Sequence, residues 1–303
     1  MTDFIGDIHG HADKLIELLT KLGYTIKNGS YHNPDRKVIF VGDYIDRGPQ
    51  IRETLDIVKS MADSRNAIAL LGNHEYNALC FHTNDNKGRP LREHSEKNVH
   101  QHAETLRQFK NQESYFETYL DWFKTLPLFY ESDNFRVVHS CWDNEHINYL
   151  RSVLKDDRLS DNNIHQSVKK GAKLNIAIDE TLKGKEIEMP SGASFTDKDG
   201  HERTEIRVKW WKNPMTSTYK NISVEPLDNL PNELVDKSAF KNATYYNQDD
   251  KPVFFGHYWL KGNPMLYRDN ICCLDYSVAK NGYLAAYRFE NELKLDKNKF
   301  HFV

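Results

Sequence analysis

The sequence predicts an α/β fold built around a parallel β-sheet. Three short apolar segments, at residues 2–5, 37–41 and 67–71, are typical of buried strands. Each is followed by a polar loop that contains glycine and then by a helical segment. This alternation implies parallel strands, and ligands of such sheets gather outside the carboxyl ends of the strands.

The spacing of apolar residues supports each of the first elements. The segment 12–22 predicts a helix whose apolar face is formed by Leu15, Leu18, Leu19 and Leu22. The pair Asn28-Gly29 predicts a hairpin turn, because this dipeptide suits the left-handed backbone that tight hairpins need. Pro49 is expected to open a second helix, with one face formed by Ile51, Leu55 and Val58.

The rest of the chain is less uniform. Residues 82–99 are polar and are expected to be irregular, whereas 103–123 predict one long amphipathic helix. Paired strands are expected at 126–130 and 135–139, and 145–250 is the least regular stretch. The chain then returns to strands, at 252–255, 271–274, 283–289 and 300–303. Adjacent Cys272 and Cys273 are expected to fill opposite faces of one of these strands.

Composition excludes several classes of protein. Hydrophobic residues make up 39% of the 303 residues, aromatic residues 12% and charged residues 28%, which is enough apolar material for a core. The formal net charge of −3 excludes binding to nucleic acid or anionic lipid through bulk charge. Four scattered cysteines are too few for a disulfide framework.

The first residues predict a cytoplasmic protein. No apolar run is long enough to span a bilayer. A secretory signal needs an apolar stretch of about 7–15 residues, and here Met1 leads almost at once into a motif that carries chemistry.

Chemistry-bearing residues follow the predicted strands in order. The loops are Gly6-Asp7-Ile8-His9-Gly10, Gly42-Asp43-Tyr44-Ile45-Asp46-Arg47-Gly48-Pro49 and Gly72-Asn73-His74-Glu75, and after later strands Val138-His139-Ser140 and Phe255-Gly256-His257. Carboxylate, imidazole and amide oxygen are ligands of divalent metals, and glycines let backbone approach a crowded site. A single Asp-x-His occurs by chance, but this series predicts a metal centre.

This order of motifs resembles the calcineurin-like metallophosphoesterases, and within them the phosphoprotein-phosphatase group. That group includes serine/threonine phosphatases and bacterial symmetrical diadenosine tetraphosphatases. The resemblance is dense over residues 1–80 and then rests on short segments around 139, 211 and 257–289. It implies a two-sheet β-sandwich flanked by helices, with the metal site at the strand ends.

The resemblance also implies roles for individual residues. Asp7 and His9 would hold a first metal, Asp43 would bridge both metals, and the second would be held by Asn73, His139 and His257. Arg47 would clamp phosphate, with Asn73 also close to the substrate. His74, oriented by Asp46, would stand beside the leaving group. The segment Trp211-Lys212-Asn213-Pro214 and the residue Asp275 resemble structural features of the family.

Two departures from the family pattern affect the substrate and the ligands. Leu71 stands where eukaryotic protein phosphatases carry an arginine, so one phosphate clamp is missing or comes from elsewhere, with Arg207, Lys209 and Lys212 as candidates. Tyr258-Trp259 follows Gly256-His257, so the Gly-His-x-His pattern of nuclease-like relatives is absent.

Simpler interpretations hold for other residues of these types. His100 and His102 alternate near a helix start and are expected to be ordinary histidines rather than metal ligands. His11 could support the ligands from behind. Trp210 and Trp211 are expected in the core rather than as a stacking platform for bases, and Cys141 is expected to pack.

The sequence thus predicts a single domain over 1–303 with insertions at about 82–125 and 145–250 around the mouth of the site. Its expected activity is hydrolysis of phosphate esters by a metal-bridging hydroxide, because two metals lower the pKa of a shared water. The main interpretation is a phosphomonoesterase of serine/threonine-phosphatase type; a dinucleoside polyphosphate hydrolase and a silent metal- or phosphate-binding module are the alternatives. Manganese is the favoured metal, with iron, zinc, cobalt and nickel also possible, and the expected substrate is a phosphoprotein, a nucleotide or a small molecule. Neither a membrane nor nucleic acid is expected as a partner.

Overall fold

The computed structural model describes residues 1–303 except for 191–192, 197–201, 226, 228–229 and 241–243. At its centre is a six-stranded sheet with the order β14-β15-β1-β4-β5, in which β16 also pairs with β15. These strands are β1 (Thr2–Ile5), β4 (Lys37–Phe40), β5 (Ala67–Ala69), β14 (Asp275–Tyr276), β15 (Tyr283–Phe289) and β16 (Phe300–Phe302). Strands β1, β4 and β5 are parallel, as predicted, and β15 is antiparallel to β1.

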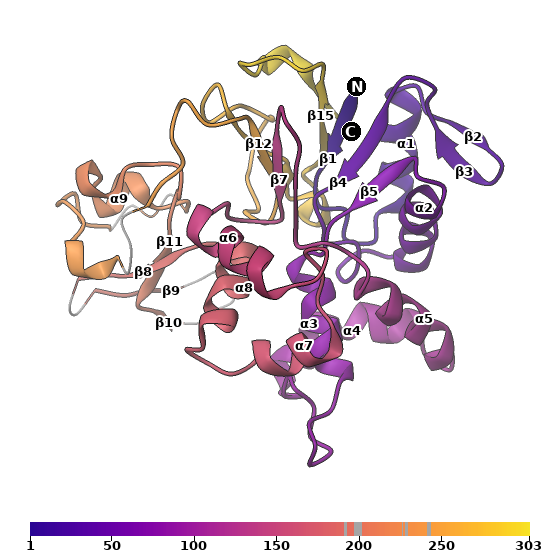
Figure 1. Ribbon diagram of the computed structural model, residues 1–303, viewed down its shortest axis with the longest axis horizontal. Coiled ribbons are helices and arrows are strands. Elements are labelled where there is room, and N and C mark those ends of the chain that lie inside the picture. Colours follow the sequence, from indigo (N-terminus) through magenta and orange to yellow (C-terminus); the bar gives the residue numbers. More distant parts are fainter. Residues whose placement is uncertain (191–192, 197–201, 226, 228–229, 241–243) are drawn as a thin grey trace.

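Helices connect the parallel strands. Helix α1 (Ala12–Lys21) follows β1, α2 (Ile51–Asp63) follows β4, and α3 (Asn73–His82) follows β5. Figure 1 shows α2 beside β5. The predicted hairpin is also present, as β2 (Thr25–Lys27) and β3 (Ser30–His32), with left-handed backbone at Asn28 and Gly29.

A second sheet packs on the first. Its order is β13-β12-β7-β6, formed by β6 (Phe129–Glu131), β7 (Arg136–Val138), β12 (Val253–Phe255) and β13 (Ile271–Cys273). Strands β7 and β12 are parallel, as are β12 and β13, whereas β6 and β7 form the predicted antiparallel pair.

The layer between the sheets is aromatic. Phe4 on β1 and Phe254 on β12 stack with their ring centroids 3.7 Å apart, and Phe135, Tyr287 and Phe289 pack around them. Cys272 belongs to this layer, whereas its neighbour Cys273 belongs to the main core on the opposite face. The predicted two-sheet sandwich flanked by helices is therefore confirmed, as is the division of the two cysteines.

The prediction of one continuous helix over 103–123 is wrong. The segment forms α4 (Glu96–Gln108) and α5 (Glu113–Phe123), separated by a turn in which Asn111 has a left-handed backbone. Helix α4 also begins earlier than predicted, because Ser95 caps it by accepting a hydrogen bond from the backbone of Asn98. Apolar spacing continues across the turn, and for this reason the sequence pattern did not show the break.

The stretch 145–250 contains more regular structure than expected. Its helices are α6 (Asn144–Val153), α7 (Asp161–Ser167), α8 (Lys173–Lys183) and α9 (Tyr219–Ile222). Its strands pair as β8 (Glu186–Glu188) with β11 (Glu205–Arg207) and β9 (Phe195–Thr196) with β10 (Glu202–Arg203). A small separate core lies here, around Ile187, Ile206, Tyr219 and Ile222.

Short 3₁₀ turns complete the chain: η1 (Pro214–Thr216), η2 (Lys237–Ala239), η3 (Val278–Lys280) and η4 (Lys297–Lys299). Among the residues described, no helix combines the length and the apolar character that crossing a membrane would require. That the chain is one domain with insertions at 82–125 and 145–250 stays a prediction.

Candidate metal centre

The predicted ligands come together at the carboxyl ends of five strands. Asp7 and His9 follow β1, Asp43 follows β4, and Asn73 opens α3 after β5; His139 and His257 follow β7 and β12 of the second sheet. All six side chains are buried. The carboxyl ends of strands from both sheets thus meet at a buried polar cluster.

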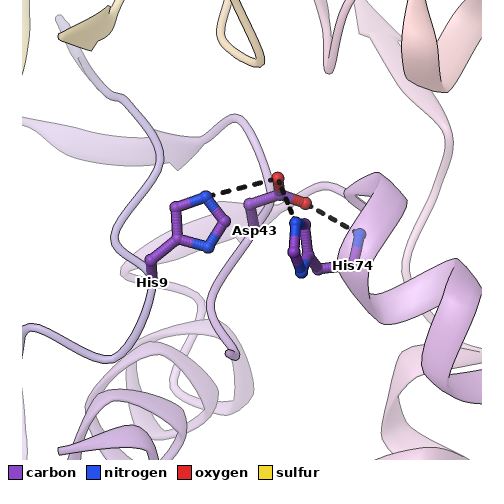
Figure 2. Close-up of side chains that lie close together, drawn as sticks. All are labelled: His9, Asp43 and His74. Atoms are coloured by element: carbon purple, nitrogen blue, oxygen red, sulfur yellow. Dashed lines mark hydrogen bonds and ion pairs between the residues drawn. The ribbon is translucent and has the colours of Figure 1, made fainter. Parts of the chain in front are cut away.

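Asp43 lies at the centre of this cluster, between histidines of both sheets. Its Oδ2 atom is 3.6 Å from Nε2 of His9 and 4.0 Å from Nε2 of His74 (Figure 2), and its Oδ1 atom is 3.4 Å from Nε2 of His139. One carboxylate therefore faces two groups of nitrogen ligands, which is the arrangement that a bridging ligand requires.

Asn73 joins the group on the side of the second sheet. Its Oδ1 atom lies 3.0 Å from Nε2 of His139 and 2.7 Å from Nδ1 of His257. An amide oxygen and two ring nitrogens converge there, and Asp43 closes the set. A second group lies on the other side of Asp43. It consists of ligand atoms from His9, Asp43 and His74, which are also close to one another.

The ring orientations fit metal ligation. Nδ1 of His9 is 3.0 Å from the carbonyl oxygen of Ile45, and Nδ1 of His139 is 2.9 Å from that of Val41. Each ring that donates its Nδ1 proton to a carbonyl turns an unprotonated Nε2 into the cluster, which is how metal-binding histidines are usually held.

Unpartnered polar atoms give a second test of the fit. Oδ1 of Asp7 and Nε2 of His9 are buried and have no hydrogen-bond partner within the described part of the chain. Buried polar atoms without partners are costly, whereas metal coordination would satisfy them. The donor set therefore fits two divalent ions held by oxygen and imidazole ligands.

Two glycines allow this crowding. A Cβ atom on Gly256 would lie 1.9 Å from Oδ1 of Asp7, and one on Gly72 would lie 2.3 Å from Oδ1 of Asp43. Any other residue at either position would displace a candidate ligand.

The loops also hold non-glycine residues in the left-handed backbone region. These are His9, Asp43, Asp46, Arg47, His257 and Trp259, with φ between 48° and 74°. Such conformations cost about 1–3 kcal/mol each for a non-glycine residue, so the packing around the site has to stabilise them.

His74 and Asp46 form the predicted pair. Nδ1 of His74 hydrogen-bonds to Oδ2 of Asp46, which leaves the Nε2 atom facing Asp43 (Figure 2). Burial lowers the pKa of His74, but Asp43 and the hydrogen bond to Asp46 outweigh it and raise the value. Burial raises the pKa of Asp46, and hydrogen bonds from His102 and His74 outweigh it and lower the value. A histidine held by a carboxylate in this way can act as a proton donor.

Sequence reasoning missed the residues behind Asp46. Nδ1 of His102 lies 2.8 Å from Oδ1 of Asp46, and the hydroxyl of Thr105 donates to the same oxygen at 2.6 Å. Nε2 of His102 is in turn 3.1 Å from Nε2 of His82. His102 therefore supports Asp46 and is not, among the described residues, one of the groups that could hold a metal. Its contact with Asp46 depends on how α4 packs, which no local pattern shows.

Glu75 is a second missed residue. Its carboxylate accepts hydrogen bonds from the backbone N–H groups of Asp43, Tyr44, Ile45 and Gly72, at 2.8–3.2 Å. It joins the second loop to the third. The sequence does contain a signal for this role, because Glu75 is the third residue of the helix that follows Gly72. A glutamate at this spacing is typical of helix capping.

Arg47 follows Asp46 in the loop that also carries Asp43. Its side chain is exposed, and its guanidinium carbon is 5.7 Å from the ring centroid of Trp259. Across the described ranges of the chain, no ion pair includes Arg47. A structural salt bridge is therefore not its role, and its donors remain available for an anion.

The other residues singled out from the sequence have structural roles. Nδ1 of His11 stays within its own loop, 2.9 Å from the carbonyl oxygen of His9. Trp210 and Trp211 are buried in the core, and Cys141 is a buried thiol whose pKa burial raises. Asp275 accepts a hydrogen bond from the backbone N–H of Trp259 at 2.6 Å.

Comparison with known proteins agrees with this geometry. A family model described as calcineurin-like phosphoesterase matches residues 2–257. The protein named Bis(5'-nucleosyl)-tetraphosphatase PrpE [asymmetrical] of Halalkalibacterium halodurans is 48% identical over 73 residues, and that of Bacillus subtilis is 42% identical over 73 residues. These matches cover 24% of this chain and 30% of each relative, so the chain matches less than a third of these relatives' length. Both relatives carry the asymmetrical rather than the symmetrical designation.

Solved structures support the fold. A protein serine/threonine phosphatase from Saccharomyces cerevisiae has a TM-score of 0.52 at 13% identity, covering 100% of this chain and 78% of that one. A cold-active protein tyrosine phosphatase has a TM-score of 0.51 at 17% identity, covering 95% of this chain and 73% of that one. At these identities the likeness concerns the fold alone.

Proposed function

Because the chain belongs to the calcineurin-like phosphoesterase family, we propose that it hydrolyses phosphate esters with two divalent metal ions. The observation that carries this proposal is the position of Asp43, whose two carboxylate oxygens face His9 on one side and His139 on the other. Asp7 and His9 would hold one ion, Asn73, His139 and His257 the other, and Asp43 both. When bound, the ions supply a polarised water and positive charge beside the phosphate.

The chain's own residues would do the remaining work. Arg47 orients the phosphoryl group, because its planar fork can donate to two oxygens at once. His74 would donate a proton to the departing oxygen from Nε2, while Asp46 holds the ring through Nδ1. Asn73 lies at the edge of the cluster, where its amide is also close enough to orient substrate.

Arg207 is the best supported candidate for a second phosphate contact. Burial is the main cause that lowers the pKa of His257, and the charge of Arg207 adds to it. Nη2 of Arg207 also pairs with Oε1 of Glu186 at 3.5 Å. The Nε atom of Arg207 is buried and has no hydrogen-bond partner among the residues that the structure describes. Lys209 and Lys212 fit poorly, because both amino groups are directed to the carbonyl oxygen of Asn221.

The main candidate substrate is a phosphomonoester, and the alternative is a dinucleoside polyphosphate. The names of the partial relatives favour the alternative, and Leu71 in place of an arginine weakens the case for phosphoproteins. A silent metal- or phosphate-binding module is less well supported, because such a module has no chemical need for Asp43, Asn73 and His74 together.

The test is a measurement of metal content and turnover on the same protein. Purified protein should bind two metal ions per chain and hydrolyse an aryl phosphate, with manganese compared against iron, zinc, cobalt and nickel. A panel of phosphopeptides, nucleotides and diadenosine tetraphosphate then ranks substrates; ATP with AMP as products indicates asymmetrical cleavage, and two ADP indicates symmetrical cleavage. Two bound metals without turnover on any phosphate ester would refute the proposed activity.

A further inference from the structure

Two exposed cations among the described residues lie over the ring of Trp259. The guanidinium carbon of Arg47 is 5.7 Å from the indole centroid, and the amino nitrogen of Lys280 is 5.0 Å from it. The imidazole of His9 stacks on the same indole, with centroids 5.2 Å apart and planes 27° apart. One aromatic side chain thus links a candidate metal ligand to two positive charges.

Neither cation is neutralised by the protein. Over the described residues, no carboxylate lies within ion-pair distance of Arg47 or Lys280, and both side chains are exposed. Other surface lysines differ: Lys299 pairs with Glu290 at 3.0 Å and with Glu292 at 3.1 Å. Cation–π contacts hold a charge in place without consuming its hydrogen-bond donors, so these two cations are positioned and still able to bind an anion.

A buried carboxylate fixes this arrangement. Asp275 is 2% exposed; it accepts from the backbone N–H of Trp259 at 2.6 Å and from that of Ser277 at 3.0 Å. Ser277 begins the turn η3 that carries Lys280, and its hydroxyl donates to the carbonyl oxygen of Leu260 at 2.9 Å. The loop of Trp259 and the turn of Lys280 are therefore held together from within the protein.

The two cations differ in their distance from the candidate metal centre. Arg47 belongs to the same loop as Asp43, and it lies over the indole on which the ring of His9 stacks. Lys280 reaches the indole from η3, which supplies none of the candidate ligands. An anion that touches both cations must extend outward from the reacting phosphate.

We propose that Lys280, held over Trp259, forms a subsite for the second phosphate of a substrate that contains linked phosphates, while Arg47 holds the reacting one. The inference rests on the proposed function, because the reacting phosphate has to lie at the metal centre. Of the two candidate substrates, it favours the alternative, a dinucleoside polyphosphate, over a simple phosphomonoester. The two side chains suit these two roles. The guanidinium of Arg47 can contact two oxygens of one phosphate, whereas the ammonium of Lys280 acts as a point charge.

The test compares two product-like inhibitors of aryl phosphate hydrolysis by the metal-loaded enzyme at fixed free metal. One is orthophosphate, which occupies only the reacting position, and the other is methylenediphosphonate, whose two phosphorus groups cannot be hydrolysed apart. The variants are Lys280→Met, Lys280→Arg and, as matched control, Lys261→Met, which removes an exposed lysine two residues beyond Trp259.

We expect Lys280→Met to raise the ratio of the diphosphonate to the orthophosphate inhibition constant about tenfold, the loss of one charge-assisted contact. Lys280→Arg should restore most of the ratio, and Lys261→Met should leave it at the parental value. A ratio that stays constant in Lys280→Met, or that changes equally in Lys261→Met, overturns the subsite. If the parent protein does not hydrolyse the aryl phosphate at all, the proposed function fails instead. Calorimetry then tests the subsite separately, through the ratio of the dissociation constants of the diphosphonate and of orthophosphate.

Discussion

Nδ1 of His102 lies 2.8 Å from Oδ1 of Asp46, the carboxylate whose other oxygen holds His74. A residue of α4 thus supports the candidate proton donor from behind, together with the hydroxyl of Thr105. The position of His74 consequently depends on a helix that contributes no metal ligand.

Replacing His102 should therefore act through Asp46. His102→Leu removes one donor to the carboxylate, so Asp46 becomes a stronger acceptor for His74 and the pKa of His74 rises. Because a general acid loses activity as pH rises through its pKa, the alkaline limb of kcat/KM for alkyl phosphates should move to higher pH. The less constrained ring should also slow these substrates about tenfold.

The measurement is a pH profile of the variant beside His100→Gln, which removes an exposed histidine from the same helix. A limb that stays in place, with a uniform loss at every pH, would show that His102 only stabilises the fold.

Asp43→Asn should abolish activity and leave the fold intact. The change removes the single anionic ligand that faces both groups of histidines, at 3.6 Å and 3.4 Å. Elemental analysis should show less than the parental metal content, and circular dichroism should match the parent. Activity within a few-fold of the parent, with both metals still bound, would exclude a shared carboxylate.

Arg47→Lys should not be a conservative change. Lysine keeps the charge but loses the planar fork that can contact two phosphoryl oxygens, so kcat/KM should fall about 10- to 100-fold for every phosphate substrate, including those with good leaving groups. Steady-state kinetics on one aryl and one alkyl phosphate check this. Unchanged turnover and affinity would mean that Arg47 does not touch the phosphate.

The need for His74 should depend on the leaving group. An alkoxide is a strong base and needs a proton as it departs, whereas a nitrophenolate does not. His74→Asn should slow alkyl phosphates about 10²–10⁴-fold, the usual range for general acid catalysis, and aryl phosphates much less. Asp46→Asn should show the same pattern more weakly, because the imidazole remains but is less well oriented.

The check is kcat/KM across leaving groups of graded pKa, and the dependence of the rate on leaving-group pKa should steepen in both variants. An equal loss on every substrate would assign His74 to the metals or to phosphate binding. That outcome would agree with its place among the groups that could hold a metal with His9 and Asp43.

Glu75→Gln should destabilise the protein and weaken its metal binding together. The carboxylate accepts four backbone N–H groups, and an amide would turn an N–H toward some of these donors. We expect the free energy of unfolding to fall by about 2–4 kcal/mol, because each unsatisfied buried donor costs about 1–3 kcal/mol. Urea unfolding measures the loss, with the exposed Glu53→Gln on α2 as control; equal midpoints in the two variants would contradict it.

The sequence predicted those parts of the fold that local patterns determine. Strands of β-branched residues, the Asn28-Gly29 turn and the order of strand-end loops were sufficient for the parallel sheet, and the resemblance to a family supplied the second sheet. The six candidate ligands converge as predicted, because parallel strands bring their carboxyl ends to one edge.

Other features depend on long-range packing and could not be predicted in this way. The break between α4 and α5 interrupts an apolar spacing that itself continues. His102 and Asp46 are 56 positions apart, and Lys280 reaches Trp259 only because Asp275 joins their loops. No pattern of neighbouring residues contains this information.

The left-handed residues around the cluster imply a conflict between durability and chemistry. His9, Arg47 and His257 hold backbone conformations that glycine or asparagine would adopt at lower cost. Selection for thermal stability alone should therefore replace these residues. Selection for turnover should bring the original residues back. The positions where the folded backbone is most strained would then be the positions that catalysis needs.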